Sequence, residues 1–435
     1  MKNIVLTECH DVIGINENVG DNKTITPSQA DELAKFIEAQ KLKSEYIRWG
    51  NKTIKFINYV GFIQCATFSI EILPKITVHN DFSQMRKVLI GMLNDCGYLN
   101  VKTSTLSQLQ LIDGSLLEIF GRIYASHLFK ELTKGIMMEY QQVENNLMVL
   151  KGSLIIRKHI KENLSRNKKY MAYCEYEERT INHEINQVFV AANQLLLKSI
   201  KDIETQKLLK QIDHMLDGVQ LRTFSKKQLT RINLDRINKR FEPPLLLAKQ
   251  FLMNITASFS VKNNNSFSFL FEMNDLFEKY ITLLVKQETK HAVYEQHKEY
   301  KLLVNEHNGN DIFQLKPDIF VDNGNTQIII DTKWKTLTSG NRSGVKRDDL
   351  FQMYAYLTRY EHAKTAILLY PKQLELEIDY NEHIQSWYLH ANKEKKMKVY
   401  SVSLESKVKT IKELNKILQI NGLRKTNEYR SDDIK

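Results

Sequence analysis

Two aspartates and a lysine stand at the ends of two apolar stretches in the C-terminal part of the chain. Asp318 directly precedes the first stretch, Asp331 ends the second, and Lys333 follows two residues later. If the two stretches are neighbouring strands of a hairpin, both carboxylates lie at one end of a sheet. Two close carboxylates stay ionised only when a cation lies between them, and hard divalent ions such as Mg²⁺ take oxygen ligands. The pattern therefore predicts a magnesium site.

An amine beside such a site suits phosphodiester hydrolysis. Side chains alternate along a strand, so Asp331 and Lys333 point to the same face. From there Lys333 could hold or deprotonate an attacking water and stabilise charge in the transition state, while the carbonyl of Thr332 could add a metal ligand. A bound metal would lower the pKa of the water and polarise the phosphoryl oxygen. In the simpler alternative, Asp318 only begins a strand and Asp331 only pairs with Lys333.

The two residues after Lys333 have different expected roles. Trp334 alternates to the opposite face, where we expect it in the core under a helix. Lys335 returns to the face of Lys333 and could contact a phosphate, although it could equally be a surface lysine.

Helices and strands alternate around these residues. We expect an amphipathic helix over residues 268–287, then the two strands, joined by a turn that contains Asn323 and Gly324. Asn-Gly is a strong hairpin signal. A helix over 348–360 follows, and three further strands are expected at residues 364–371, 374–380 and 397–404.

The spacing of these residues resembles a known nuclease signature. Pro-Asp, twelve residues and then Asp-Thr-Lys is similar to the PD-(D/E)xK pattern. The resemblance implies a further metal-site carboxylate, Glu278, on the preceding helix. Gln352 and Tyr356, one helical turn apart, resemble the QxxxY pattern of RecB-like nucleases. Glu278 could instead be a solvated charge, and the other two could be interior polar groups that fix the helix to the sheet.

The chain as a whole resembles the McrC family, the nuclease subunits of McrBC-type, 5-methylcytosine-specific restriction systems. The resemblance extends over roughly residues 55–370. It is carried, in this order, by the segments VGFIQCATFSIEILPKI, FLFEMNDLFEKYI, KPDIFV, DTKWK and DLFQMYAYL.

The family implies two partners, double-stranded DNA and a hexameric McrB-like AAA+ GTPase that recognises and translocates it. The N-terminal region of the chain would dock on that ring and stimulate GTP hydrolysis, and the C-terminal domain would cut both DNA strands. The sequence has no GxxxxGK[ST] motif, so we expect GTP to be bound by the partner and not by this chain.

The charge of the chain is compatible with a nucleic acid partner. The net charge is +11 and the pI is about 9.1, which attracts polyanions, although a lysine-rich surface would give the same values. Basic residues gather at 157–169 and 225–241. Either segment could follow a DNA backbone or be a solvated face, and the first could also dock a partner.

The expected location is the cytoplasm. No apolar run reaches the ~18 residues of a membrane span, and the first residues are too acidic for a signal peptide. The four cysteines are scattered without a CxxC pair, which argues against a zinc site and a disulfide framework.

These patterns predict an α/β (α+β) protein of several parts. Residues 1–135 would form a partner-docking domain with a small sheet, and 136–262 a mainly helical region with a short β-like section near its start. Residues 263–405 would form a PD-(D/E)xK nuclease domain, followed by a charged helix and tail over 406–435.

The expected function is a Mg²⁺-dependent DNA endonuclease subunit that also stimulates the partner's GTPase. One alternative is a regulatory cofactor that docks into the GTPase ring with a weak or idle nuclease site. Another is a RecB-like exonuclease that acts alone.

Overall fold

The structure is a computed structural model, and it divides the chain into two units. Unit 1 comprises Met1–Asp113 and Leu270–Lys435, and unit 2 comprises Gly114–Phe269. The described residues are 2–16, 23–76, 81–101, 114–256, 266–324, 326–335, 337, 344–372, 383–390 and 392–423.

These units differ from the predicted domain boundaries. Residues 1–113 share a unit with the region predicted to be the nuclease, and the helix at 116–133 belongs to unit 2. The domain assignment stays a prediction. The mixed α/β class is confirmed, because helices and several sheets alternate along the chain.

The N-terminal part of unit 1 is built on two small sheets. In the first, β1 runs parallel to β7, and β7 pairs antiparallel with β6. The second has the order β3-β2-β5-β4. Helix α1 begins with a capping box of Thr26 and Gln29 and packs Leu33 and Phe36 into the core. The bounds are β1 Lys2–Thr7, β2 Ile13–Ile15, β3 Thr24–Ile25, α1 Pro27–Ala39, β4 Ile47–Gly50, β5 Thr53–Phe56, β6 Tyr59–Gln64, β7 Phe68–Leu73 and α2 Phe82–Asp95.

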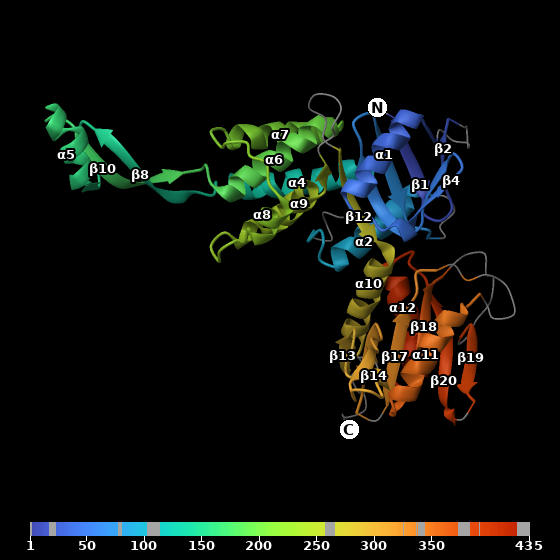
Figure 1. Ribbon diagram of the computed structural model, residues 1–435. Helices are drawn as coiled ribbons and strands as arrows, with labels where there is room; N and C mark the ends of the chain where they lie inside the picture. The colour runs from blue at the N-terminus through green and yellow to red at the C-terminus, as the bar shows by residue number, and fades with distance from the viewer. Residues whose placement is uncertain are drawn as a thin grey trace, which may run out of the picture. The chain divides into compact units, whose positions relative to one another are not determined.

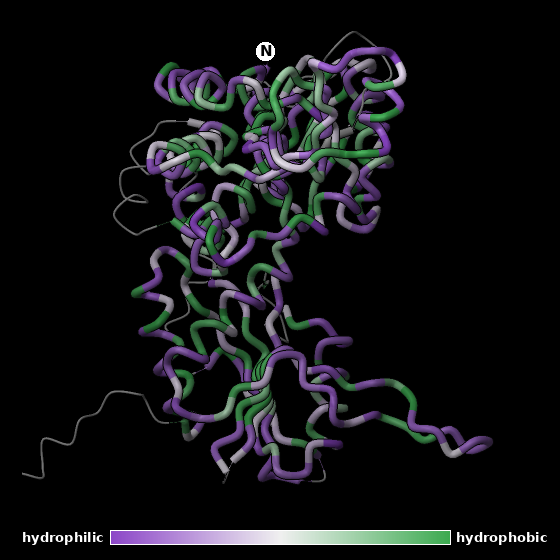
Figure 2. The backbone as a smooth tube through the Cα atoms, turned by 90° about the vertical axis from the view of Figure 1, so that its left-hand side faces the viewer, coloured by the Kyte–Doolittle hydropathy of each residue, from purple (hydrophilic) through white to green (hydrophobic). Residues whose placement is uncertain are grey.

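The C-terminal part of unit 1 is a six-stranded sheet of order β13-β16-β17-β18-β20-β19 (Figure 1). Helix α11 covers one face through a cluster that includes Met353, Ile329 and Leu368. The central strands form the hydrophobic part of this region (Figure 2). The bounds are α10 Met273–Glu288, β13 Ala292–Glu295, β14 Lys301–Val304, β15 Asp311–Gln314, β16 Ile319–Asp322, β17 Gln327–Thr332, α11 Arg347–Arg359, β18 Ala363–Pro371, β19 Gln385–Leu389, β20 Asn392–Val402 and α12 Lys407–Ile420.

The predicted order of this region is confirmed with additions. The hairpin of β16 and β17 forms as expected, with Gly324 at φ 84° in its turn. Residues 268–272 are not helical but belong to β12 (Ser266–Glu272), where apolar and polar residues alternate. Edge strand β13 and the β14–β15 hairpin were not predicted. The predicted strand at 374–380 lies outside the described residues.

Unit 2 combines a helical bundle with a three-stranded ribbon (Figure 1). In the bundle, Tyr124 donates a hydrogen bond to the carbonyl of Phe189 at 3.0 Å. The short strands β11 and β12 pair antiparallel. The bounds are α4 Leu116–Thr133, α6 Glu184–Ser199, α7 Ile203–Met215, α8 Lys226–Arg231, α9 Glu242–Met253 and β11 Ile255–Thr256.

The ribbon is longer than the short β-like section that the sequence predicted near the start of this mainly helical region. Strand β10 pairs along its whole length with β8, and β9 adds a short third strand. Its bounds are β8 Glu139–Leu147, β9 Ser153–Leu154, α5 Ile156–Glu162 and β10 Ala172–Thr180. Both basic segments of the sequence lie in this unit, around α5 and around α8, and their contact with DNA stays a prediction. Among the described residues, no helix is long and apolar enough to cross a membrane.

Candidate active site

Strand pairing brings the two predicted aspartates opposite each other. In the β16–β17 hairpin, Ile319 pairs with Ile330, so the next position in register sets Asp318 against Asp331. Asp331 is completely buried, with 0% of its surface exposed. The strand pairing thus places the two aspartates of the sequence motif next to each other in the sheet.

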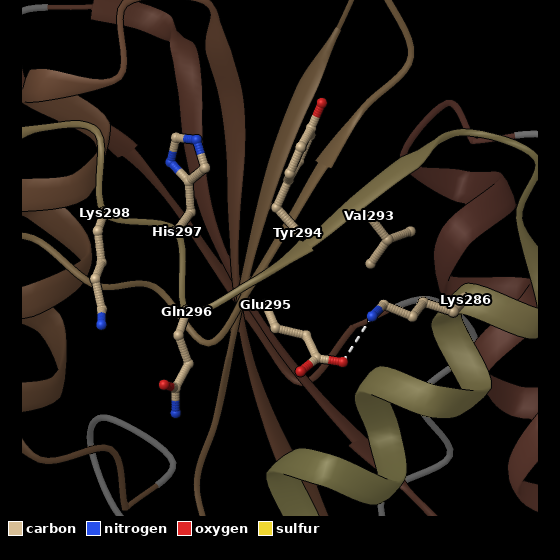
Figure 3. Close-up of a pocket in the computed structure, with 7 residues that line it drawn as sticks. All are labelled: Lys286, Val293, Tyr294, Glu295, Gln296, His297 and Lys298. Atoms are coloured by element: carbon tan, nitrogen blue, oxygen red, sulfur yellow. Dashed lines mark hydrogen bonds and ion pairs between the residues drawn. The ribbon is translucent and has the colours of Figure 1, made fainter. Parts of the chain in front are cut away.

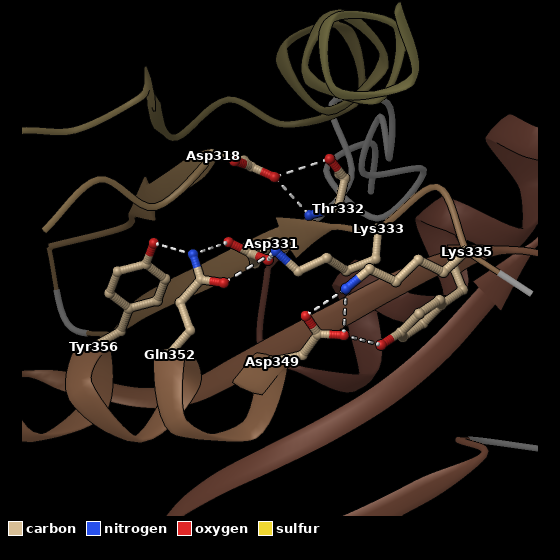
Figure 4. A network of polar contacts seen from close by, with 9 residues as sticks. Asp318, Asp331, Thr332, Lys333, Lys335, Asp349, Gln352 and Tyr356 are labelled. Carbon is tan, nitrogen blue, oxygen red and sulfur yellow. Dashed lines mark hydrogen bonds and ion pairs between the residues drawn. The ribbon is translucent and has the colours of Figure 1, made fainter. Parts of the chain in front are cut away.

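The carboxylate of Asp318 is held by the end of β17. Its Oδ2 atom accepts hydrogen bonds from the backbone N–H of Thr332 at 2.7 Å and from the Thr332 hydroxyl at 2.9 Å (Figure 4). Burial raises the pKa of Asp318, and these two bonds to the charged form oppose the rise. Thr332 therefore contacts Asp318 through its amide and hydroxyl, whereas the sequence analysis considered only its carbonyl, as a metal ligand.

Asp331 and Lys333 form an ion pair inside the site. Burial and the nearby charge of Asp318 raise the pKa of Asp331 to about 7, although Lys333 lowers it. Burial alone would lower the pKa of Lys333, but the charge of Asp331 raises it above its usual value. The lysine is therefore a cation at neutral pH.

Helix α11 supplies the polar side chains that orient this pair. Gln352 accepts a hydrogen bond from the Lys333 ammonium at 3.0 Å through its Oε1 atom. Its Nε2 donates to the Tyr356 hydroxyl at 2.8 Å and to Asp331 at 3.3 Å (Figure 4). Burial raises the pKa of Tyr356, so its hydroxyl stays protonated. The structure thus brings both predicted α11 residues to the aspartate–lysine pair.

Glu278 approaches the same centre from α10. Its Oε1 accepts a hydrogen bond from Gln296 Nε2 at 2.9 Å, and the backbone N–H of Gln296 donates to the carbonyl of Asp318 at 2.9 Å. Burial raises the pKa of Glu278, and the charge of Asp318 raises it further. Gln296 was missed by the sequence analysis, because it lies outside the motif.

The donor set fits a hard divalent cation in its chemistry. Asp318, Asp331, Glu278 and the carbonyl of Thr332 offer only oxygen atoms, which Mg²⁺ prefers. Each carboxyl has a raised pKa, and for Asp331 and Glu278 the charge of Asp318 is one of the causes. A cation would relieve that repulsion. Among the described residues, however, no three acidic, histidine or cysteine side chains already stand as a ready metal cluster.

A second polar cluster at the site was not predicted. Lys335 donates to both oxygens of Asp349, at 2.7 and 2.9 Å, and Tyr370 donates to the same carboxylate at 3.3 Å (Figure 4). The side chain of Lys335 is partly exposed, and its ammonium is held by the buried carboxylate of Asp349. Asp349 had only the weak signal of an acidic residue in the first turn of a helix.

An open pocket of about 570 Å³ lies beside Gln296 and is lined by Lys286, Val293, Tyr294, Glu295, Gln296, His297 and Lys298. In Figure 3, Tyr294 and His297 point to one side of the strand, and Glu295 and Gln296 to the other. Gln296 is shared with Glu278, so the pocket adjoins the candidate site.

The comparisons with known proteins agree on one family. A family model described as "McrBC 5-methylcytosine restriction system component" matches residues 54–371. No curated protein matches the chain.

Two solved structures share the fold. One is described as a refined half-complex from a tetradecameric assembly of Thermococcus gammatolerans McrB AAA+ hexamers with bound McrC. Its matching chain has a TM-score of 0.77 at 22% identity, and the match covers 97% of this chain and all of that one. The other is a cryo-EM structure of the Thermococcus gammatolerans McrBC complex, with a TM-score of 0.53 at 23% identity. That match covers 66% of this chain and 88% of the other.

Proposed function

Because this chain belongs to the family of McrBC 5-methylcytosine restriction system components, we propose that it is the nuclease subunit of such a system. In this proposal it is a Mg²⁺-dependent DNA endonuclease with a PD-(D/E)xK site. The observation that carries the proposal is the buried network of Asp331, Lys333, Gln352 and Tyr356 opposite Asp318.

Asp318, Asp331, Glu278 and the Thr332 carbonyl are the residues that would hold the cation. When bound, a divalent ion lowers the pKa of the attacking water and polarises the phosphoryl oxygen. The side chains of the site would supply binding and orientation around the scissile phosphate.

Lys333 acts in this proposal as a fixed cation. Its raised pKa keeps it protonated, so it holds the attacking water and stabilises negative charge rather than abstracting a proton. Gln352 fixes the ammonium, since its carbonyl oxygen accepts a hydrogen bond from Lys333 while its amide NH₂ donates to Asp331 and Tyr356. This favours charge stabilisation over the general-base role that the sequence left open.

The pocket next to Glu278 suits a DNA strand. Lys286 and Lys298 line it, and Lys298 in particular offers positive charge for phosphates. Tyr294 and His297 offer rings on which a sugar or base can pack. A strand lying there would pass Gln296 and reach the carboxylates.

A McrB-like AAA+ GTPase is the proposed protein partner, whose activity this chain would stimulate. The ribbon of unit 2 presents large apolar side chains to solvent, which marks a surface that a partner covers. They are Met148, Val149, Leu150, Ile156 and Ile160. This surface adds a candidate docking site to the N-terminal region that the family resemblance suggested.

The deciding experiment is Asp331→Ala in the complex with the McrB-like subunit of the same system. We expect loss of DNA cleavage in GTP and Mg²⁺, while GTPase stimulation is retained. Asp348→Ala, an exposed neighbour of Asp349 on α11, is the matched control and should cleave normally.

Other outcomes would favour the two alternatives. Wild-type protein that stimulates GTP hydrolysis but never cuts DNA would indicate a regulatory cofactor with an idle site. Digestion of linear DNA from its ends by this chain alone would indicate an exonuclease.

A further inference from the structure

Trp334, the residue after the site lysine, is held from the N-terminal part of the same unit. Its side chain is 4% exposed, and its indole N–H donates to Glu8 Oε1 at 2.5 Å. Its carbonyl accepts a hydrogen bond from the Lys75 ammonium at 3.2 Å. The ring packs on Phe277 of α10, with 5.4 Å between the centroids. Trp334 is thus a core residue, as predicted. Polar contacts also hold both its indole N–H and its backbone carbonyl.

Glu8 and Lys75 lie just beyond the ends of two paired parallel strands. Glu8 follows β1, Lys75 follows β7, and the Glu8 amide donates to the carbonyl of Leu73 at 2.9 Å. Both are almost fully buried, with 1% and 6% of their surfaces exposed. Charged residues are rarely buried to this extent without a specific partner. Here Glu8 and Lys75 interact with each other, and both also bind Trp334 of the C-terminal part of the unit.

The backbone turns sharply after Glu8. Cys9 has a φ of 62°, a left-handed conformation that is unusual for a residue other than glycine. The turn is held by the Cys9 amide, which donates to the carbonyl of Phe56 at 2.8 Å, and by its thiol, which donates to Ile57 at 3.0 Å. Such strain persists only where surrounding contacts hold it. The turn directs the chain away while Glu8 stays against the indole.

The segment 332–334 is therefore fixed at each of its residues. Thr332 binds Asp318, the Lys333 amide donates to the carbonyl of Leu369 at 2.9 Å, and Trp334 binds Glu8 and Lys75. A shift of Trp334 would move the backbone that carries the site lysine. Misplacement by about 1 Å at a reacting group can cost about 10²-fold in rate.

We propose that Glu8 and Lys75 are positioning residues of the nuclease site, which act through Trp334 on Lys333. The inference rests on the proposed nuclease function and adds to it a requirement for the first strand of the chain. The N-terminal sheet then has a part in DNA cleavage that is separate from partner docking.

The test compares variants in the complex with the McrB-like subunit, in GTP and Mg²⁺. Trp334→Phe keeps an aromatic ring but removes the N–H donor along with part of the indole. We expect its kcat for cleavage to fall at least tenfold, while KM for DNA and GTPase stimulation stay close to wild type and Tm falls less than in Glu71→Gln. Trp49→Phe, at an exposed position of β4, is the matched control and should leave all four unchanged.

A second pair of variants tests the acceptor. Glu8→Ala should reduce kcat as Trp334→Phe does. Glu8→Gln should restore it, because an amide oxygen also accepts a hydrogen bond from the indole N–H. Glu71→Gln controls for general weakening of the sheet, since Glu71 is equally buried but pairs with Arg86 at 2.8 Å. It should lower Tm more than it lowers cleavage.

Two results would overturn the inference while the proposed function stands. One is wild-type cleavage by both Trp334→Phe and Glu8→Ala where Asp331→Ala is inactive. The other is a loss of rate that merely follows Tm, as in Glu71→Gln, because that indicates a contact for stability alone. If Asp331→Ala still cleaves, the proposed site and this inference fail together.

Discussion

The candidate site and the ribbon of unit 2 depart in opposite ways from the usual distribution of residues. In the site, charged side chains are buried and bound to one another, and Asp331 is completely covered. In the ribbon, apolar side chains face solvent, with Met148 77% and Val149 74% exposed. Buried charge and exposed apolar surface are both informative exceptions in a folded protein.

The contrast indicates two kinds of ligand. Buried carboxylates with raised pKa values are suited to a divalent cation, whose positive charge compensates theirs and can in turn bind a phosphate. Exposed apolar residues contribute favourably to binding when another protein covers them and removes them from water. Chemistry and assembly should therefore be separable by substitution, and the following predictions can break or sharpen that separation.

The largest effect is expected for Lys333→Met. Loss of the fixed cation should reduce the single-turnover rate of DNA cleavage by about 10²–10³-fold, with GTPase stimulation unchanged. Lys346→Met, at the exposed start of α11, is the control. Equal loss of both activities would mean that site and docking are not separable.

The corresponding test of partner docking is a triple substitution on the ribbon, Met148→Ser with Val149→Ser and Leu150→Ser. Loss of about 1 kcal/mol of binding at each position would weaken the complex by about 100-fold. GTPase stimulation measured against protein concentration should shift accordingly. The Tm of the free chain should hardly change, because these side chains are exposed. Val408→Ser, at an exposed position of α12, should bind normally.

A smaller effect is expected for the two α11 side chains that orient Lys333, Gln352 and Tyr356. Gln352→Ala removes the carbonyl that accepts from Lys333 and should lower kcat about tenfold, the equivalent of one hydrogen bond. Tyr356→Phe removes only the hydroxyl that orients Gln352 and should cost less. If Tyr356→Phe were the more damaging change, its hydroxyl would contact the substrate directly.

The smallest effect on cleavage is expected for Glu8→Gln, whose consequence lies in stability. Burial raises the pKa of Glu8 from 4.5 to about 7, although Lys75 and the Trp334 N–H oppose the rise. The folded state then holds a proton that the unfolded state releases, so wild-type stability falls as pH rises through that window.

The glutamine variant carries no such penalty. Its free energy of unfolding should exceed that of wild type by up to about 3 kcal/mol at pH 8, and the difference should vanish near pH 4. Denaturant titrations at several pH values in the absence of metal measure it. A difference that does not depend on pH would show that Glu8 keeps its ordinary pKa.

The part of the site that the sequence predicted is the part encoded by short-range spacing. Strand alternation and the Asn-Gly turn placed Asp318, Asp331 and Lys333 together, and one helical turn placed Gln352 beside Tyr356. These relations depend only on the geometry of one hairpin and one helix. The structure confirms that the residues meet, while their roles in catalysis stay predictions.

The contacts that were missed depend on chain topology. Glu8 lies 326 residues before Trp334, and the two meet only through the tertiary packing of unit 1. Asp349 and Gln296 likewise meet the site through tertiary packing, which no local pattern contains. Local spacing gave no means of pairing these residues.

Strand β10 of the ribbon was missed for a different reason. Strand β10 is rich in polar residues and only Cys174 is buried in it, so it lacks the apolar alternation by which a strand is recognised. A strand that is solvated on both faces resembles a loop in its composition. The sequence contains the apolar residues that lie between strands β8 and β9, but it does not show that they are exposed.

The contact between Glu8 and Trp334 also affects the point during synthesis at which the candidate site can be assembled. During synthesis on the ribosome, β1 and β7 emerge long before Trp334 is added. A nascent chain would therefore contain Glu8 and Lys75 before it contains Trp334 and Lys333. Under our inference, the ability to cut DNA arises only once Trp334 has emerged and packs against Glu8.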